Sequence, residues 1–214
     1  MRGRLVVFLL GAIVIFAGAY VAYSALDTLQ RLNMVEAERD TWQRPGDVLQ
    51  ALALKPGDVV ADLGSGAGYF ALKISPIAGS RGQVLAVDIR KLSLAFLWMR
   101  AATRVPHNVQ IIVGGEDDPR LPRDGVDAVL IANTFHELKN PEKELDHVSA
   151  ALRANGRLVI VDRGPGSENS GHEIPLETAE RDVKAKGFEI ARVDDRFVDR
   201  AGDEPWWLLV ARKP

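Results

Sequence analysis

Short apolar runs alternate with amphipathic stretches along most of the chain, which predicts an α/β fold. Runs rich in valine, isoleucine and leucine indicate strands over Val59–Leu63, Gln83–Asp88, Val109–Val113, Val126–Ala132 and Arg157–Val161. Apolar residues at helical spacing indicate helices over Pro45–Leu54, Tyr69–Ile77, Leu92–Thr103 and Pro141–Leu152. Near-continuous apolar strands separated by helices are typical of a parallel sheet with helices on both faces.

The end of the chain has a different pattern. A helical stretch over residues 177–188 precedes two strand-like runs, 188–198 and 205–214, and the turn sequence RAGDE joins these runs. Two strands with so short a connection pair in antiparallel fashion. We therefore predict a Rossmann-like, seven-stranded, mostly parallel sheet with an antiparallel C-terminal hairpin. Such sheets bind ligands beyond the carboxyl ends of the strands, where the strand order reverses.

The N-terminal residues differ from the rest in lacking a polar face. Residues 5–26 contain no charged residue, and Arg2 and Arg4 precede them. About 20 apolar residues allow a helix to cross a bilayer, so we expect residues 1–26 to form a single-pass transmembrane helix or an uncleaved signal anchor. The alternative is a signal peptide on an exported protein, although its apolar core usually has only about 7–15 residues. Residues 27–44 are expected to form a stalk or outer helix, and residues 45–214 the folded domain.

Composition removes several classes of function. The chain has 214 residues and a formal net charge of −2, with no long run of like charges. We therefore expect no nucleic-acid partner. The absence of cysteine excludes disulfides, thiolate metal sites and a cysteine nucleophile. No group of His, Asp and Glu has the spacing of metal ligands, so no metal is expected.

The sequence VVADLGSGAGYF, residues 59–70, places a glycine-rich loop between a strand and a helix. Such a loop lets backbone N–H groups approach an anionic group of a ligand. Residues 66–71 fit the dinucleotide pattern G-x-G-x-x-G/A, but Asp62 would then bring a negative charge close to a pyrophosphate. Residues 62–68 also read D-x-G-x-G-x-G, which suits a ligand with a carboxylate and an ammonium group, such as S-adenosylmethionine (SAM). Asp88 could accept hydrogen bonds from both ribose hydroxyls or cap the following helix.

From about Arg39 to the end, the chain resembles class I SAM-dependent methyltransferases, in the branch that includes ubiquinone/menaquinone-biosynthesis and arsenite methyltransferase-like enzymes. The stretches that carry the resemblance are VVADLGSGAGYF, VLAVDIR, GGEDDPRLP, VDAVLIANTFHEL and LRANGRLVIVDRG. Their order along the chain is also that of the family. The resemblance implies that residues 45–214 form a methyltransferase domain with SAM as its cofactor.

The same resemblance implies a role for individual residues. The methionine part of SAM would be surrounded by Asp62, Gly64, Ser65, Gly66 and Gly68, its ribose would bind Asp88, and its adenine would lie beside Ile89. An acidic side chain of the GGEDDP loop would bind the adenine amino group. Because Gly115 occupies one alignment of that acid, the candidates are Glu116 and Asp117, and Asp117 is preferred. Asn133 would lie at the reactive end of the cofactor.

Two segments offer candidate catalytic or substrate residues. His136 follows the fourth strand and could accept a proton from an attacking oxygen or nitrogen; the alternative is a histidine that packs or caps locally. Asp162, Arg163 and His172 border the stretch RGPGSENSG, which is a candidate substrate lid or an ordinary surface loop. His172 is a second candidate base.

These features favour methyl transfer by direct displacement to a small-molecule or lipid-like acceptor, with the membrane contacted through residues 5–26. The alternatives are an NAD(P)-dependent oxidoreductase on a similar sheet and a non-catalytic, membrane-tethered SAM-binding domain. Charge counting leaves the membrane orientation open. Because SAM is made in the cytosol, we expect a cytosolic catalytic domain with the N-terminus outside.

Overall fold

A computed structural model of the chain describes residues 2–165, 173–199 and 205–214, with side chains from residue 10 onward. The chain divides into two compact units, Met1–Trp42 and Gln43–Pro214. The expected turn at residues 200–204 and His172 lie outside the described residues.

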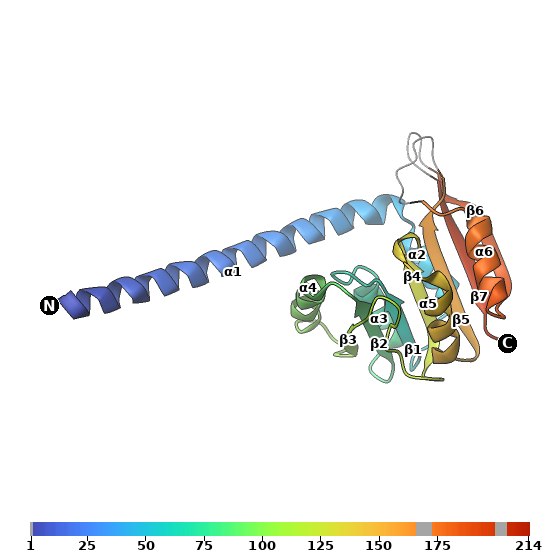
Figure 1. Cartoon of the computed structure of the whole chain (residues 1–214), viewed down its shortest axis with the longest axis horizontal. Coiled ribbons are helices and arrows are strands. Elements are labelled where there is room, and N and C mark those ends of the chain that lie inside the picture. The colour runs from blue at the N-terminus through green and yellow to red at the C-terminus, as the bar shows by residue number, and fades with distance from the viewer. Residues whose placement is uncertain (1, 166–172, 200–204) are drawn as a thin grey trace. The chain divides into compact units, whose positions relative to one another are not determined.

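The first unit is one helix, α1 (Arg2–Trp42, Figure 1). Its described apolar part is long and apolar enough to cross a membrane, a test that a signal sequence also passes. A membrane helix and a stalk were expected to meet near residue 26, and helix α1 is continuous across this position. Residues 27–42 contain no glycine or proline, and Arg31 pairs with Asp27 at helical spacing, so the helix continues into the polar segment.

The second unit contains a seven-stranded sheet with the strand order β3-β2-β1-β4-β5-β7-β6. The strands are β1 (Val59–Leu63), β2 (Gln83–Asp88), β3 (Val109–Val113), β4 (Val126–Ala132), β5 (Leu152–Arg163), β6 (Glu189–Val198) and β7 (Trp206–Arg212). The first five pair in parallel, whereas β7 pairs antiparallel with both β5 and β6. This architecture confirms the predicted fold, and the strand order reverses between β1 and β4.

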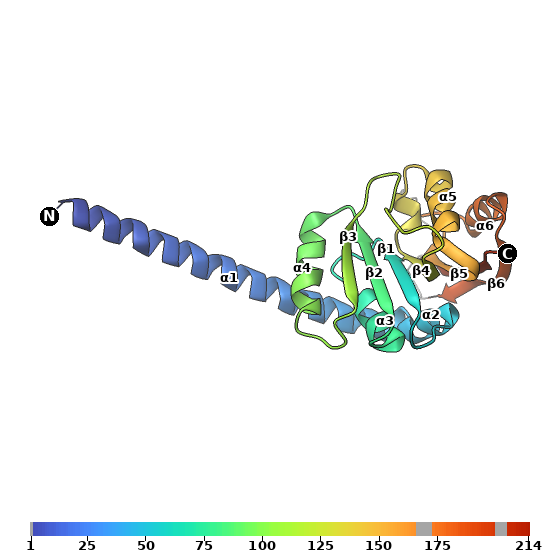
Figure 2. The same cartoon turned by 90° about the horizontal axis from the view of Figure 1, so that it is seen from below.

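Helices cover both faces of this sheet. They are α2 (Pro45–Leu52), α3 (Ala71–Ala78), α4 (Lys91–Ala101), the short 3-10 helix η1 (Phe135–Glu137), α5 (Pro141–Ala151) and α6 (Leu176–Ala185). Figure 2 shows α2 and α3 on one face and α5 and α6 on the other. The main core lies under α5 and α6, where Leu145, Val148 and Val183 pack against strand residues such as Ile131 and Ile160.

Strand β5 begins earlier than the sequence pattern predicts. The expected start was Arg157, but Leu152 already pairs with Val126 of β4, and a register shift follows before Ala128 pairs with Arg157. Residues 153–156 (Arg, Ala, Asn and Gly) therefore form an irregular start of the strand. Its carboxyl end, which matters for the site, is extended by two residues to Arg163.

Candidate functional site

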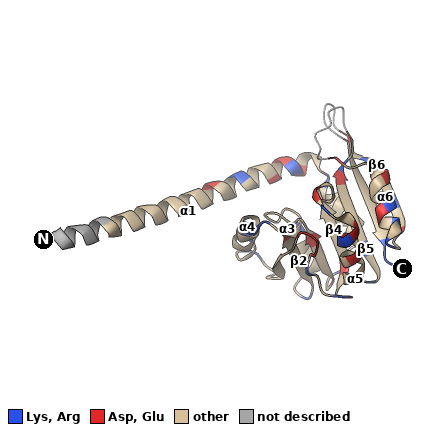
Figure 3. Ribbon diagram, viewed as in Figure 1, with Lys and Arg blue, Asp and Glu red and all other residues tan. Residues whose placement is uncertain are grey.

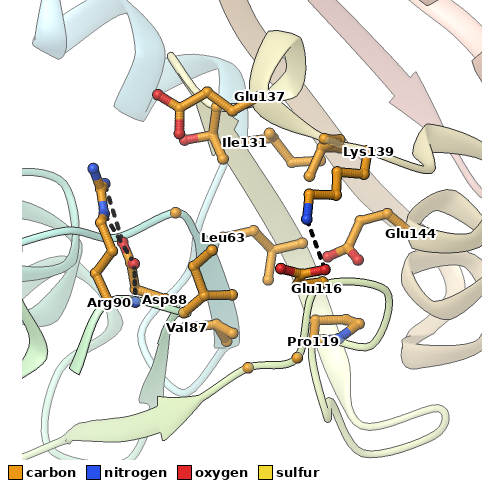
Figure 4. Close-up of a pocket in the computed structure, with 16 residues that line it drawn as sticks. Leu63, Val87, Asp88, Arg90, Glu116, Pro119, Ile131, Glu137, Lys139 and Glu144 are labelled. Atoms are coloured by element: carbon orange, nitrogen blue, oxygen red, sulfur yellow. Dashed lines mark hydrogen bonds and ion pairs between the residues drawn. The ribbon is translucent and has the colours of Figure 1, made fainter.

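A cleft lies beyond the carboxyl ends of the central strands, next to the reversal of strand order (Figure 4). The space within the cleft and at its open mouth together is about 800 Å³. Its walls come from four parts of the chain: the ends of β1 and β2 (Leu63, Gly64, Val87, Asp88, Ile89, Arg90), the loop after β3 (Gly114, Gly115, Glu116, Pro119), the segment around β4 and η1 (Ile131, Thr134, Glu137, Leu138, Lys139), and Glu144 of α5.

The glycine loop after β1 is held by strong geometric constraints. Gly64 has φ of +75°, and a Cβ atom there would lie 2.1 Å from the Thr134 Oγ1 atom. At Gly68, where φ is +95°, a Cβ atom would lie 2.2 Å from the Leu97 Cδ1 atom. Only glycine combines these backbone angles with such close neighbours. The loop therefore brings main chain directly against the β4–η1 segment.

The N–H groups of these glycines are bound within the protein, contrary to the expectation that they face a ligand. The Gly64 N–H donates to the carbonyl oxygen of Val87 (2.9 Å) and the Gly68 N–H to that of Ser65 (2.8 Å). The Gly66 N–H donates to Asp88 Oδ2 (2.8 Å). The β1–β2 pairing continues one residue beyond β1, and this continuation occupies the first donor. These hydrogen bonds show that the glycines shape the loop, and their contact with a cofactor stays a prediction.

Asp88 fixes the loop to the end of β2. In addition to the Gly66 bond, its Oδ1 atom accepts the backbone N–H of Arg90 (2.7 Å), and the Arg90 guanidinium lies 3.3 Å away. The hydrogen bond that the Arg90 guanidinium donates to Asp88 raises the pKa of Arg90. The N-cap residue of α4 is Arg90, whose side chain forms no capping hydrogen bond, so Asp88, two residues earlier, is not the N-cap residue. The Asp88 side chain is buried, yet it borders the cleft.

Four further predicted residues lie in the segments that border the cleft. Asp62 is buried at the end of β1, and Ile89 is exposed and lines the cleft. Ser65 is buried, and its hydroxyl has no hydrogen-bond partner among the described residues; the same holds for the Oδ1 atom of Asn133, which has φ of +54°. Buried polar atoms normally have partners. These two atoms, next in sequence to the cleft residues Gly64 and Thr134, fit a site that receives a polar ligand.

The acidic loop separates the two candidates for an adenine contact. Glu116 lines the cleft, and Lys139 Nζ lies 2.8 Å from its carboxylate. The Asp117 carboxylate lies outside the cleft lining and binds Asn140 and Lys143 instead, at the start of α5. These hydrogen bonds lower the pKa of Asp117. Sequence reasoning preferred Asp117, whereas the structure brings Glu116 to the cleft.

Glu144 is a cleft residue that sequence reasoning missed. It is only 7% exposed, and its carboxylate has no hydrogen bond or ion pair within the described ranges. Burial, with smaller contributions from Asp118 and Asp117, raises the pKa of Glu144 to about 7. A signal was present in the sequence, because position 144 precedes the buried Val148 by four residues and therefore lies on the apolar side of α5.

His136, Asp162 and Arg163 form a cluster behind the cleft. His136 Nδ1 lies 2.7 Å from Asp162 Oδ1, and the backbone N–H of His136 donates to Asp162 Oδ2 (3.0 Å). His136 Nε2 lies 3.4 Å from Arg163 Nη2. If hydrogens are assigned from these neighbours, Nδ1 donates to Asp162 and Nε2 accepts from Arg163. The His136 and Asp162 side chains are 1% and 0% exposed, and neither lines the cleft. Within the described ranges, no group of three or more His, Asp or Glu side chains could hold a metal ion.

Comparisons with known proteins agree with this geometry. A family model described as a methyltransferase domain matches residues 54–193, which is more than half of the chain. Among curated proteins, the ubiquinone/menaquinone biosynthesis C-methyltransferase UbiE of Marinomonas sp. (strain MWYL1) is 25% identical over 122 residues, 56% of this chain and 48% of the relative. UbiE of Vibrio vulnificus (strain YJ016) is 28% identical over 110 residues, 50% of this chain and 42% of the relative. The chain thus spans about half the length of the curated relatives it matches.

Solved structures show the same fold at low sequence identity. A SAM-dependent methyltransferase from Aquifex aeolicus has a TM-score of 0.73 at 23% identity and covers 87% of this chain and 98% of its own. Phosphoethanolamine N-methyltransferase 2 of Haemonchus contortus, in complex with S-adenosylhomocysteine, has a TM-score of 0.68 at 20% identity, with 81% and 53% covered. The [4+2]-cyclase SpnF has a TM-score of 0.70 at 19% identity, with 80% of each chain covered. A cyclase among these structures means that the fold alone does not fix the reaction. The match of the family model over residues 54–193 does decide the family, and this chain belongs to the methyltransferase-domain family.

Proposed function

We propose that this chain is a SAM-dependent methyltransferase that acts on a small-molecule acceptor. The single observation that carries the choice of cofactor is the charge of the cleft. Three carboxylates line it, at Asp88, Glu116 and Glu137, against two cations, Arg90 and Lys139; the fourth acidic residue, Glu144, has a raised pKa of about 7 and is not counted as a charge. Both cations already contact cleft carboxylates, Asp88 and Glu116. Such a site favours the cationic sulfonium of SAM over the anionic pyrophosphate of NAD(P).

The predicted cofactor residues take complementary parts in this proposal. Asp88 keeps free lone pairs for the ribose hydroxyls, because each carboxylate oxygen can accept more than one hydrogen bond. Ile89 would cover one face of the adenine, and Glu116 would accept from its amino group. The hydroxyl of Ser65 and the amide of Asn133 would bind the amino-acid end, with Asp62 nearby to balance positive charge. Gly64, Gly66 and Gly68 would provide the close backbone approach.

When bound, SAM supplies an electrophilic methyl group and leaves as a neutral thioether after the acceptor has taken the methyl carbon. The leaving sulfur needs no proton, so alignment of the acceptor and exclusion of water are the main tasks of the protein. In the described geometry both ring nitrogens of His136 have partners. This favours a positioning role for His136, in which it joins the segment after β4 to Asp162 of β5. The neighbouring Arg163 would then face the acceptor, as the sequence prediction proposes.

We further propose a lipid-like acceptor, a membrane anchor at residues 5–26, and domain limits of 1–26, 27–44 and 45–214. The anchor is supported by the apolar helix α1. The names of the UbiE relatives place those proteins in quinone biosynthesis, and quinones are lipid-soluble molecules. The catalytic domain would face the cytosol, where SAM is made.

Calorimetric titration of the purified full-length protein in mild detergent, with SAM and NADH separately, tests the proposal. SAM should bind and NADH should not. Asp88→Asn should weaken SAM at least tenfold, because it turns one accepting oxygen into a donor toward the ribose hydroxyls. Asp118→Asn is the control, since Asp118 is exposed and outside the cleft lining. Binding of NADH without SAM would refute the proposal.

Transfer and topology need separate assays. Labelled methyl groups from SAM should appear in a lipid extract only when the protein is present; SAM binding without transfer to any fraction would favour the non-catalytic alternative. Protease added to intact cells should leave residues 43–214 uncut. Digestion from outside would instead support export of the domain.

A further inference from the structure

Helix α4 and its flanking loops carry positive charge without any acidic residue. Residues 89–115 contain Arg90, Lys91, Arg100 and Arg104 and no Asp or Glu, so the rest of the chain has a formal net charge of −6. On α6, by contrast, acidic and basic residues are mixed, as Figure 3 shows. Helix α4 packs at the β3 end of the sheet and α6 at the β6 end. The charge of the domain is therefore segregated toward one end.

Large apolar side chains are exposed on the same segment. The exposed fractions are 57% for Ile89, 73% for Leu92, 63% for Trp98 and 80% for Val105. Leu94 and Leu97 are buried, so α4 packs one side against the core and carries further apolar side chains on its outer side. Four large exposed apolar residues within seventeen positions are not scattered surface residues, and such patches mark interaction sites.

The cations of this segment divide into inward and outward groups. Arg100 is buried and donates to the carbonyl oxygen of Ala67. Lys91 and Arg104 are exposed, and neither forms an ion pair within the part of the chain that the structure describes. Trp98, Arg104 and His107 also line a shallow hollow beside the end of α4. Unpaired cations thus flank exposed apolar side chains at both ends of the helix.

We propose that the surface formed by Lys91, Leu92, Trp98, Arg104 and Val105, here called the α4 surface, docks onto an anionic lipid bilayer. Tryptophan favours the boundary between headgroups and acyl chains, and each nearby Lys or Arg gains roughly 1 kcal/mol at an anionic membrane surface. Exposed apolar side chains flanked by exposed basic residues suit contact with an anionic membrane surface. Leu92, Trp98 and Val105 would enter the interface, and Lys91 and Arg104 would bind lipid phosphates.

Docking of this surface would bring the cleft to the membrane. Ile89 and Arg90, which directly precede α4, also line the cleft. An acceptor could then pass from the bilayer into the cleft without crossing bulk water. This step rests on the proposed methyltransferase function and gives its substrate class: an amphipathic acceptor that partitions into the lipid phase.

The test uses the full-length protein reconstituted in phosphatidylcholine vesicles that contain about one third phosphatidylglycerol, with some acyl chains brominated. Brominated chains quench tryptophans that reach the interface, and the difference between the wild type and Trp98→Phe reports Trp98 alone. We expect strong quenching of Trp98 in these vesicles and little in pure phosphatidylcholine. The double variant Lys91→Glu and Arg104→Glu should weaken docking at least tenfold, since each cation contributes roughly fivefold.

The matched control is the double variant Arg181→Glu and Lys184→Glu on α6, which makes the same charge change at the other end of the sheet. It should leave Trp98 quenching unchanged. High salt should weaken the docking of the wild type as the α4 double variant does, because it screens exposed charges. Trp98 quenching that depends on neither lipid charge nor salt would refute the role of the cations.

Aqueous acrylamide separates the other outcomes. If acrylamide reaches Trp98 in vesicles as easily as in detergent, the surface faces water and the proposal is wrong. If neither acrylamide nor brominated lipid reaches Trp98, a protein or a second copy covers it, which also refutes membrane docking. SAM titration of the same vesicles distinguishes failure of the docking proposal from failure of the proposed function. SAM binding without Trp98 quenching would refute docking alone. Trp98 quenching without SAM binding would refute the cofactor assignment alone.

Discussion

The buried carboxyl group of Glu144 makes the stability of the domain depend on pH in a specific direction. Its pKa is raised to about 7 in the folded protein from an ordinary value of 4.5, chiefly by burial. A raised carboxyl pKa means that the folded state holds the proton more tightly than the unfolded state. Folding is therefore favoured while the group is neutral, and stability falls as pH rises from about 4.5 through about 7. Glu144→Gln keeps the shape of the side chain and removes the charge.

The expected size follows from the two pKa values. Their separation corresponds to about 3 kcal/mol at pH above 7. Because Glu144 borders an open cleft, partial solvent access lowers this to about 2 kcal/mol. The free energy of unfolding of Glu144→Gln, measured relative to the wild type, should thus rise by about 2 kcal/mol between pH 5 and pH 8.5.

Urea unfolding of the full-length protein in mild detergent, followed by tryptophan fluorescence at both pH values, measures this difference. Glu142→Gln is the matched control, since Glu142 lies in the same first turn of α5 and is exposed. That variant should show little change with pH. An equal effect of Glu144→Gln at pH 5 and pH 8.5 would refute the reasoning, because it would mean that Glu144 has the same proton affinity in the folded and unfolded states.

Three further perturbations test the packing of the site by the same unfolding assay. Gly64→Ala should destabilise the domain by about 2 kcal/mol or more, because its Cβ would collide with Thr134 at a positive φ. The control is Gly57→Ala, where φ is also positive but no atom lies within 4 Å of the added Cβ, so that it measures the backbone contribution alone. Equal losses of stability in the two variants would contradict the collision. Asp162→Asn should cost about 1–3 kcal/mol by disturbing the buried bonds to His136, whereas a neutral result would show that this cluster is dispensable for folding. Lys139→Met removes an exposed ion pair and should change stability by less than about 0.5 kcal/mol; a loss above 1 kcal/mol would show that the pair with Glu116 organises the cleft.

The central strands could be predicted from the sequence because their apolar runs have clear ends. The expected bounds of β1, β2, β3 and β4 are those of the structure. Each run is short, rich in β-branched residues and bordered by polar residues or glycine, so local pattern suffices. Strand β5 differs because Leu152 is followed by Arg, Ala, Asn and Gly, which interrupt the apolar run, and its pairing with β4 contains a register shift. That pairing depends on the neighbouring strand and leaves no local signal.

The site was predictable only where one segment builds it. The glycine loop and Asp88 follow from the strand–loop–helix pattern of residues 59–88. Glu116, Lys139 and Glu144 come together from three separated positions, and no sequence spacing predicts that the loop after β3 faces the start of α5. The same limit explains the preference for Asp117, because its contacts with Asn140 and Lys143 are tertiary.

Two cleft carboxyl groups end up with different hydrogen-bonding capacities, and this difference suits an adenosine ligand. Asp88 receives hydrogen bonds from two backbone N–H groups and the Arg90 side chain, an environment for a carboxylate that only accepts. Glu144 is buried without such donors and carries a proton through much of the range below pH 7, so its acid can both donate and accept. Ribose hydroxyls can donate to Asp88, while adenine offers an amino donor next to ring-nitrogen acceptors. If Glu144 meets the adenine of the proposed cofactor, SAM affinity should fall as pH rises through about 7 in the wild type, and Glu144→Gln should remove that dependence. A pH dependence that survives Glu144→Gln would assign it to another group of the cleft.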